Sequence, residues 1–274
     1  MMLDLSLNLI DYVSLFLIIF VGIPHGALDG AISITLGCSK RVILQLGFFG
    51  AYILVSAGVI IMWYFFPVVS LIFFLFISIF HFGCGDLDWK KNKTYLINGY
   101  FHGGLVVLGI IFCNKLEVSY FFSVLSGNQL SLLWTCLYLG IILWLSALTF
   151  IVFNFKKMKL SRNYISLIII MIVFITLLPP LPAFAIYFCL IHSFNHMKRV
   201  VPTLLNFMEK GKAISLMITL SVLSWLGGAV ALYYILNLNI FPEAILKVTF
   251  IGLAALTFPH MILVDGFFRS KYKI

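Results

Sequence analysis

The chain has 274 residues, of which 63% are apolar and only 10% are charged. Soluble domains average about 45–50% apolar and about 25% charged residues, so this chain could not cover a surface that faces water. The composition excludes a soluble enzyme, a secreted disulfide scaffold and a disordered module, and it predicts that most of the chain lies in lipid. The net charge of +9 does not indicate a nucleic-acid partner, because the basic residues are scattered among short loops.

The cysteines and the N-terminal residues predict neither a disulfide framework nor a cleaved signal peptide. The five cysteines form no CxxC motif and no regular spacing, so no disulfide framework is predicted. The first eleven residues include Asp4 and Asp11 but no Lys or Arg, so the basic region of a cleavable signal is missing. We therefore expect the first hydrophobic helix to remain in the mature protein.

The apolar stretches predict an all-α, polytopic membrane bundle that forms a single membrane-embedded domain over residues 1–274. A helix needs about 20 residues to cross the hydrocarbon of a bilayer. Nine stretches qualify: 8–30, 42–65, 68–85, 95–113, 129–153, 163–179, 182–200, 213–236 and 243–267. The first stretch continues toward residue 39, which is too long for one straight helix, and Pro24, Gly26, Gly30 and Gly37 allow a kink or a re-entrant segment there. Eight spans with one re-entrant segment is the alternative.

The distribution of Lys and Arg supports nine spans. With nine spans, one side of the membrane carries sixteen basic residues: Lys40, Arg41, Lys90, Lys91, Lys93, Lys156, Lys157, Lys159, Arg162, Lys198, Arg199, Lys210, Lys212, Arg269, Lys271 and Lys273. The other side carries two, Lys115 and Lys247. Because cytoplasmic loops are enriched in Lys and Arg, the sequence predicts a multi-pass protein of the inner (plasma) membrane. Its N-terminus would lie outside and its C-terminus in the cytoplasm.

All six histidines fall inside predicted spans: His25, His81, His102, His192, His196 and His260. They come from five different helices, and most lie within about ten residues, or about 15 Å of helix, of a basic residue on the cytoplasmic side. We therefore expect one layer of imidazoles in the cytoplasmic half of the membrane. Ionisable side chains within spans indicate a functional site by default.

The pair His192 and His196 is the sharpest local motif. The i,i+4 spacing puts both rings on one helical face, where two imidazoles can bind one metal ion. The alternative is a pair of histidines that form hydrogen bonds between helices. Four further histidines at similar depth favour the metal interpretation.

Carboxylates follow several of these histidines. Asp29 lies four residues after His25, Asp86 and Asp88 follow His81, and Asp265 follows His260. A carboxylate that accepts the ring N–H of a ligating histidine fixes its tautomer. For Asp29 we favour this role. For Asp86, Asp88 and Asp265 the alternative is simple proximity to the basic interface, and for Asp88 we favour it.

Three motifs together resemble one family. They are the segment Gly22–Asp29 (GIPHGALD), the segment Phe80–Gly83 (FHFG), and the pair His192 and His196. On a polytopic chain of this length they are similar to the Brp/Blh family of membrane β-carotene dioxygenases, and the resemblance covers nearly the whole chain. This chain has Gly30 where many members have His or another polar residue, which affects the surroundings of the site and not the four histidines.

The resemblance implies an enzyme that cleaves β-carotene at its central double bond with O2 and gives two molecules of all-trans-retinal, which supply microbial rhodopsins. It implies Fe²⁺ held by four histidines: His25, His81, His192 and His196. It names no other catalytic residue. The candidates for auxiliary roles are His102, His260, Asp29, Asp86, Asn195 and Asp265. The substrate would be an apolar carotenoid taken from the bilayer, and the physiological carotenoid and the oligomeric state remain open.

Two other classes compete with this interpretation. A membrane di-iron hydroxylase or desaturase would need more histidines, arranged in several clusters. A proton-coupled transporter would use the His and Asp residues of its spans as a proton relay. Bound iron and consumption of O2 would separate an enzyme from a transporter.

Overall fold

The computed structural model describes residues 7–86, 94–155 and 161–272, and these residues form helices without any strand. They group into two compact units. Unit 1 contains the described part of residues 68–192, and unit 2 contains the described parts of residues 6–67 and 193–274. The all-helical fold predicted from the sequence is confirmed for this part of the chain. The single membrane-embedded domain stays a prediction.

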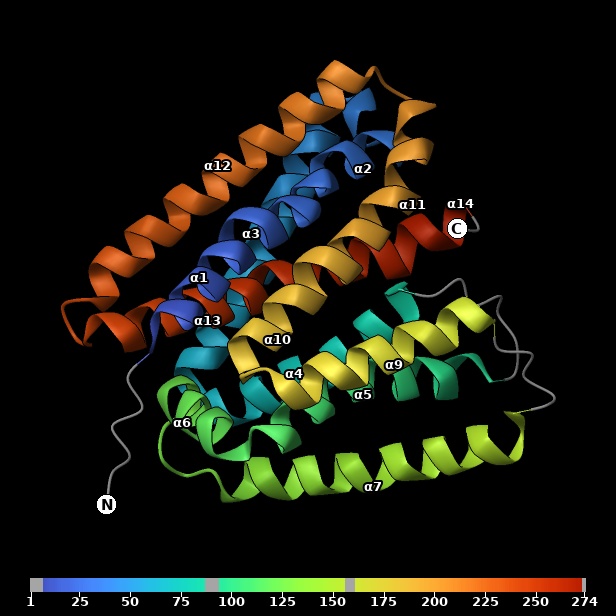
Figure 1. The fold of residues 1–274 in the computed structure, drawn as a ribbon. Helices are drawn as coiled ribbons and strands as arrows, with labels where there is room; N and C mark the ends of the chain where they lie inside the picture. The colour runs from blue at the N-terminus through green and yellow to red at the C-terminus, as the bar shows by residue number, and fades with distance from the viewer. Residues whose placement is uncertain (1–6, 87–93, 156–160, 273–274) are drawn as a thin grey trace. The chain divides into compact units, whose positions relative to one another are not determined.

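Unit 1 is built around one central helix. Its elements are α4 (Pro67–Asp86), α5 (Tyr95–Cys113), α6 (Lys115–Ser126), α7 (Ser131–Phe153), α9 (Arg162–Leu177), α10 (Pro180–Ile186) and the π-helical segment η4 (Tyr187–His192). Helix α5 contacts α6, α7, α9 and α10 (Figure 1). Its residues Val106 and Leu108 are almost completely buried, because α5 is covered by neighbours on most sides.

Glycines let the backbones of α4 and α5 come into direct contact. A Cβ on Gly83 would overlap the carbonyl group of Gly99, and a Cβ on Gly103 would overlap the carbonyl oxygen of Ile79. Small residues at such positions allow membrane helices to pack closely. The contact fixes the end of α4 that carries His81 and Asp86.

Unit 2 combines the N-terminal and C-terminal parts of the chain. Its elements are α1 (Leu9–Leu17), η1 (Ile18–Gly22), η2 (Ile23–Leu28), α2 (Asp29–Thr35), η3 (Cys38–Lys40), α3 (Val42–Phe65), α11 (Ser193–Leu205), α12 (Lys210–Ile235), α13 (Phe241–Met261), η5 (Ile262–Phe268) and α14 (Arg269–Tyr272). The short segment η2 contacts α11, α12 and α13. A buried apolar core with Ile32, Leu204 and Phe268 at its centre joins α2, α11 and η5.

The first predicted span is irregular, as its proline and glycines indicate. The helix changes from α-helical to π-helical in η1 and to 3₁₀-helical in η2 before it becomes α-helical again in α2. Pro24 stands in the first turn of η2, where its missing N–H and fixed φ angle are tolerated. The chain therefore carries His25 on the tightly wound part of this helix.

Seven helical stretches of the described residues are long and apolar enough to cross a membrane: 9–35, 42–65, 67–86, 95–113, 131–153, 210–235 and 241–272. The sixth predicted span corresponds to α9, which has only 16 residues. The seventh corresponds to the helical run of α10, η4 and α11, of which α11 is amphipathic rather than apolar. The chain is thus a helical protein with several helices that are long and apolar enough to span a membrane, and the count of nine stays a prediction.

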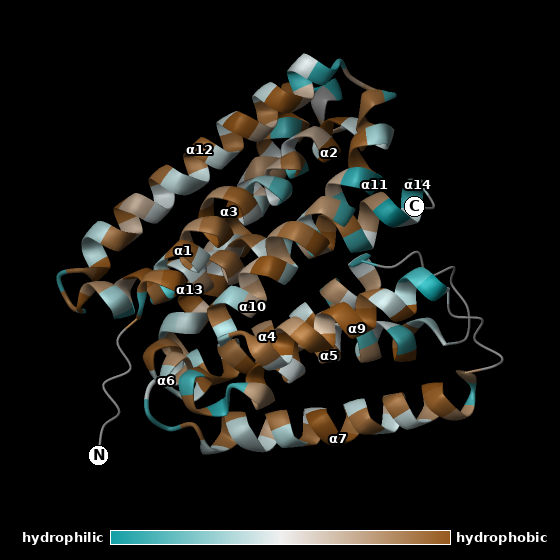
Figure 2. Ribbon diagram, viewed as in Figure 1, coloured by the Kyte–Doolittle hydropathy of each residue, from teal (hydrophilic) through white to brown (hydrophobic). Residues whose placement is uncertain are grey.

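The outer helices expose the apolar surface that lipid requires. Figure 2 shows α3, α7 and α12 as largely hydrophobic ribbons. In each of them only a small share of the most apolar window is buried. In α3, Leu54 and Tyr64 are 74% and 81% exposed. In water such apolar surface would be costly, whereas against lipid tails it is not.

Candidate metal centre

All six histidines lie in helical segments and all six are buried. Unit 1 contains His81, His102 and His192, and unit 2 contains His25, His196 and His260. The boundary of the units falls between His192 and Ser193. Each unit therefore has its own cluster of three imidazoles.

In unit 1 the carboxylate of Asp86 holds His192. The Nδ1 atom of His192 lies 2.6 Å from Oδ1 of Asp86, and the hydroxyl group of Tyr187 donates a hydrogen bond to Oδ2. All three side chains are buried. Because the carboxylate accepts the Nδ1 proton, the lone pair of the ring lies on Nε2, which is the atom left to bind a metal.

The other two histidines of unit 1 flank this arrangement. The ring of His81 lies 4.9 Å from that of His192, measured between centroids. His102 is fully buried on α5, with its Nε2 atom 3.8 Å from Oδ2 of Asp86. His102 is therefore near the carboxylate that holds His192, and its auxiliary role stays a prediction.

In unit 2 three imidazoles lie close together. The ring centroids are 5.4 Å apart for His25 and His196, 5.4 Å for His25 and His260, and 5.0 Å for His196 and His260. The rings meet at angles of 60° to 89°. They come from η2, α11 and α13, so residues far apart in the sequence form one cluster.

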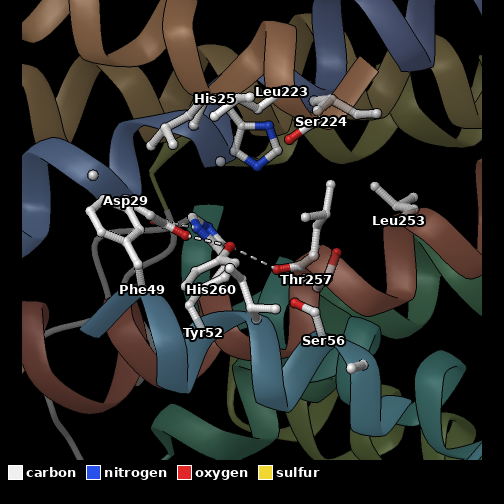
Figure 3. A pocket seen from close by; sticks show the side chains of 18 of the residues that line it. His25, Asp29, Phe49, Tyr52, Ser56, Leu223, Ser224, Leu253, Thr257 and His260 are labelled. Atoms are coloured by element: carbon white, nitrogen blue, oxygen red, sulfur yellow. Dashed lines mark hydrogen bonds and ion pairs between the residues drawn. The ribbon is translucent and has the colours of Figure 1, made fainter. Parts of the chain in front are cut away.

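The carboxylate of Asp29 holds His260 within this cluster. The Nδ1 atom of His260 lies 2.8 Å from Oδ1 of Asp29, and the hydroxyl oxygen of Tyr52 lies 2.9 Å from Oδ2. Figure 3 shows these three side chains joined by dashed lines. The proton of the Tyr52 hydroxyl is shared between this bond and the carbonyl oxygen of Leu256, 3.2 Å away.

His25 is held by its own backbone. Its Nδ1 atom donates to the carbonyl oxygen of Gly22, and the hydroxyl oxygen of Ser193 lies 3.1 Å from the same nitrogen. A carbonyl oxygen carries no proton, so Nδ1 must be the protonated nitrogen. His25, His192 and His260 therefore share one tautomer, in which Nε2 carries the lone pair.

The predicted auxiliary residues are brought together in part. Asp86 lies beside a predicted ligand, but its partner is His192 and not the neighbour in sequence, His81. Asp29 also bonds a histidine from another helix, His260. The reason is the 3₁₀-helical winding of η2: with about three residues per turn, an offset of four residues no longer returns to the same face.

The remaining candidates are Asp265, Asn195 and Asp88. Asp265 forms an ion pair with Arg269, 2.9 Å away, as expected for a residue near the basic interface. Asn195 is half-buried in α11. Asp88 lies outside the described residues.

Two functional residues were missed by the sequence reasoning: Tyr52 and Tyr187. Each donates to a carboxylate that is separated from it in sequence, by 23 and 101 positions. Tyrosines are common in membrane helices, and nothing in the local sequence distinguishes these two from the other ten. A buried carboxylate needs a second donor for its other oxygen, but that requirement names no particular residue.

An apolar cavity of about 590 Å³ adjoins the histidines of unit 2. It is within the range of about 300–1,000 Å³ that is usual for small-molecule sites. His25, Asp29 and His260 line one end, and Figure 3 shows them beside the open space. The remaining walls are mostly apolar side chains of α3, α12 and α13, among them Phe49 and Leu253. Such walls suit an apolar ligand whose reacting part lies against imidazoles.

The donor atoms fit a transition-metal ion by their chemistry. Among the described residues, no group of three or more His, Cys, Asp or Glu side chains is already arranged to hold a metal ion. Imidazole is nevertheless a suitable ligand for iron, and a carboxylate or carbonyl group on the second nitrogen is the usual support of a metal-binding histidine. His25, His192 and His260 all have that support.

The chain is similar to known proteins over nearly its whole length. Residues 16–268 match the family model described as beta-carotene 15,15'-dioxygenase. A curated protein of that name from an uncultured marine bacterium, 66A03, is 37% identical, and the alignment covers 98% of this chain and 99% of the relative. No solved structure matches the chain.

Proposed function

The chain belongs to the β-carotene 15,15'-dioxygenase family, and on this premise we propose that it cleaves β-carotene at its central double bond to give two molecules of all-trans-retinal. The observation that supports this substrate is the apolar cavity of unit 2, which has His25 and His260 at one end. Both oxygen atoms of O2 enter the products, one in each aldehyde, so no further reductant is needed. The retinal would stay in the bilayer, from which a rhodopsin apoprotein can take it up.

The proposed cofactor is Fe²⁺, with His25, His81, His192 and His196 as ligands. The support for this assignment is the His192 and His196 spacing, the burial of all four rings and the tautomers of His25 and His192. When bound, a ferrous ion would supply the redox chemistry that activates O2. Asp86 keeps the Nδ1 proton of His192 in place, and Tyr187 neutralises part of the carboxylate charge by its hydrogen bond.

The cavity can bind β-carotene through apolar contacts alone. β-Carotene is a hydrocarbon, so its binding free energy must come from burial of apolar surface at about 25 cal/mol per Å². The walls of the cavity exclude water from the polyene, which protects reactive intermediates from side reactions. No general base or nucleophile is needed from the chain.

Oxygen labelling tests the proposed reaction. Purified, iron-loaded protein is incubated with β-carotene under labelled O2, and the aldehydes are reduced at once, because aldehyde oxygens exchange with water. We expect retinol as the sole reduced product, with label in both halves of the substrate. Unequal fragments would mean cleavage away from the centre, label in one half would mean a monooxygenase, and an uncleaved hydroxylated carotenoid would mean the rival hydroxylase.

A pair of variants tests whether the substrate occupies the cavity: one fills the cavity and the other is its matched control. Ala57 lines the cavity on α3, whereas Leu54 is 74% exposed on the same helix. We expect Ala57→Phe to lower kcat/KM for β-carotene at least about tenfold, the effect of a misfit of one or two carbons in an apolar pocket. Leu54→Phe should leave it unchanged, and iron content should be equal in both. Equal activity of the two variants would place the substrate elsewhere.

We further propose nine spans in the inner membrane, with the N-terminus outside and the C-terminus in the cytoplasm. The support is the division of Lys and Arg into sixteen and two. A reporter fused after Ile274 should be active on the cytoplasmic side. Activity confined to the outside would contradict the proposed count.

A further inference from the structure

The two buried carboxylates of the histidine clusters are bonded in the same way. In unit 1, Asp86 receives Nδ1 of His192 on Oδ1 and the hydroxyl of Tyr187 on Oδ2. In unit 2, Asp29 faces Nδ1 of His260 through Oδ1 and the hydroxyl of Tyr52 through Oδ2. Each unit therefore contains a Tyr–Asp–His arrangement, and both histidines have their lone pair on Nε2.

A buried carboxylate beside a histidine destabilises the fold, so its presence needs an explanation such as metal binding by that histidine. Burying a carboxylate costs several kcal/mol, which its hydrogen bonds must offset. A packed histidine needs no such partner, whereas a ligating histidine gains a fixed tautomer and a more basic nitrogen from it. Because the support of His192, a proposed ligand, is reproduced around His260, the two histidines are expected to have the same task.

The ring centroids in unit 2 have the spacing of imidazoles that share one ion, although no group of three His, Cys, Asp or Glu side chains among the described residues is already arranged to hold one. Imidazoles that bind one ion at about 2.1 Å through Nε2 have their ring centroids about 5 Å apart when the angles between the ligands are near tetrahedral. The three pairs among His25, His196 and His260 are 5.0–5.4 Å apart. His196 and His25 are already proposed ligands, so His260 occupies the third corner of a triangle whose other corners bind metal.

We propose that His260 is a direct ligand of the metal ion, with Asp29 and Tyr52 as the residues that position it. The proposal rests on the proposed iron centre and adds a ligand that the family resemblance assigns only to a supporting role. His260 also lines the cavity, together with His25 and Asp29. The metal would therefore lie at the end of the cavity where these two imidazoles face the substrate.

Metal binding in the absence of turnover tests this assignment. Metal-free protein in detergent is titrated with Co²⁺, which reports its ligands through visible absorption bands, and iron content is measured in parallel. In His260→Ala we expect the Co²⁺ spectrum to change and affinity to fall by more than the roughly 10–100-fold loss caused by removing an outer partner. Asp29→Asn keeps the ring and should lose affinity only within that range. Ile262→Ala, an exposed neighbour (43%), should bind as the wild type does.

Three results separate the possibilities. An unchanged Co²⁺ spectrum and iron content in His260→Ala would overturn the ligand role while leaving the iron centre intact. Failure of the wild-type protein to bind either metal would instead overturn the iron centre itself. Added imidazole, which can enter the cavity beside residue 260, should restore the spectrum of His260→Ala if the lost group was a ligand. If helical circular dichroism is normal and imidazole restores nothing, the proposal is also wrong.

Discussion

Replacement of His192 by Ala is expected to abolish retinal formation and to remove most of the bound iron. The change removes one proposed ligand and also leaves Asp86 buried without the donor on Oδ1. Loss of an outer partner costs about 10–100-fold in metal affinity, so loss of a ligand should cost more. Iron per protein and retinal formed per minute are the two measurements.

The control for this variant lies on the same helical run. Phe194 is two residues away and 63% exposed, so Phe194→Ala removes a larger side chain without touching the cluster. It should keep both iron and activity. Insertion into the membrane should be normal for both variants, because the hydropathy of the run barely changes. Near-normal iron in His192→Ala would refute the ligand assignment.

Replacement of Gly103 by Val is expected to destabilise unit 1 by about 3 kcal/mol, the upper part of the range for overpacked sites. A Cβ at this position would overlap the carbonyl oxygen of Ile79, and backbone cannot move aside as a flexible side chain can. Thermal unfolding in detergent can be followed with a thiol-reactive dye, since Cys189 is buried in the same unit.

The same substitution elsewhere isolates the effect of the close contact. A Cβ added to Gly58 on α3 would meet no atom of another helix within 4 Å, so Gly58→Val should leave the unfolding temperature nearly unchanged. Iron content should fall in Gly103→Val as the α4 segment with His81 shifts. Equal unfolding temperatures for the two variants would show that the helices can separate at no cost.

The sequence predicted the all-helical fold because that fold depends on local signals. Long apolar runs identify α3 or α7 without any knowledge of their neighbours, and the i,i+4 spacing of His192 and His196 is visible directly. The resemblance to the family supplied the reaction, which the comparisons bear out. The metal itself and its ligands stay predictions.

The partners of the carboxylates could not be predicted in the same way. Asp29 lies four residues from His25 in sequence, and only the 3₁₀ winding of η2 turns it toward His260. Tyr187 meets Asp86 across 101 positions, which no period of a single helix reveals. These contacts depend on tertiary packing, so the similarity between Asp29 and Asp86 is visible only in three dimensions.

The π-helical segments make the orientation of the histidines sensitive to the deletion of a single residue. One precedes His25, one contains His192 and one follows His260. A π-turn holds one residue more than an α-turn, and such turns are frequent at functional sites. Deleting one residue from η4 would remove the extra residue of the π-turn, so the side chains within the turn, His192 among them, would change orientation while those on either side kept theirs. In α7, which has no π-turn, the same deletion would rotate every later side chain by about 100° and turn Trp144 away from the carbonyl oxygen of Phe101 on α5. A single deletion would therefore disturb the histidines directly in η4 and the packing of unit 1 in α7.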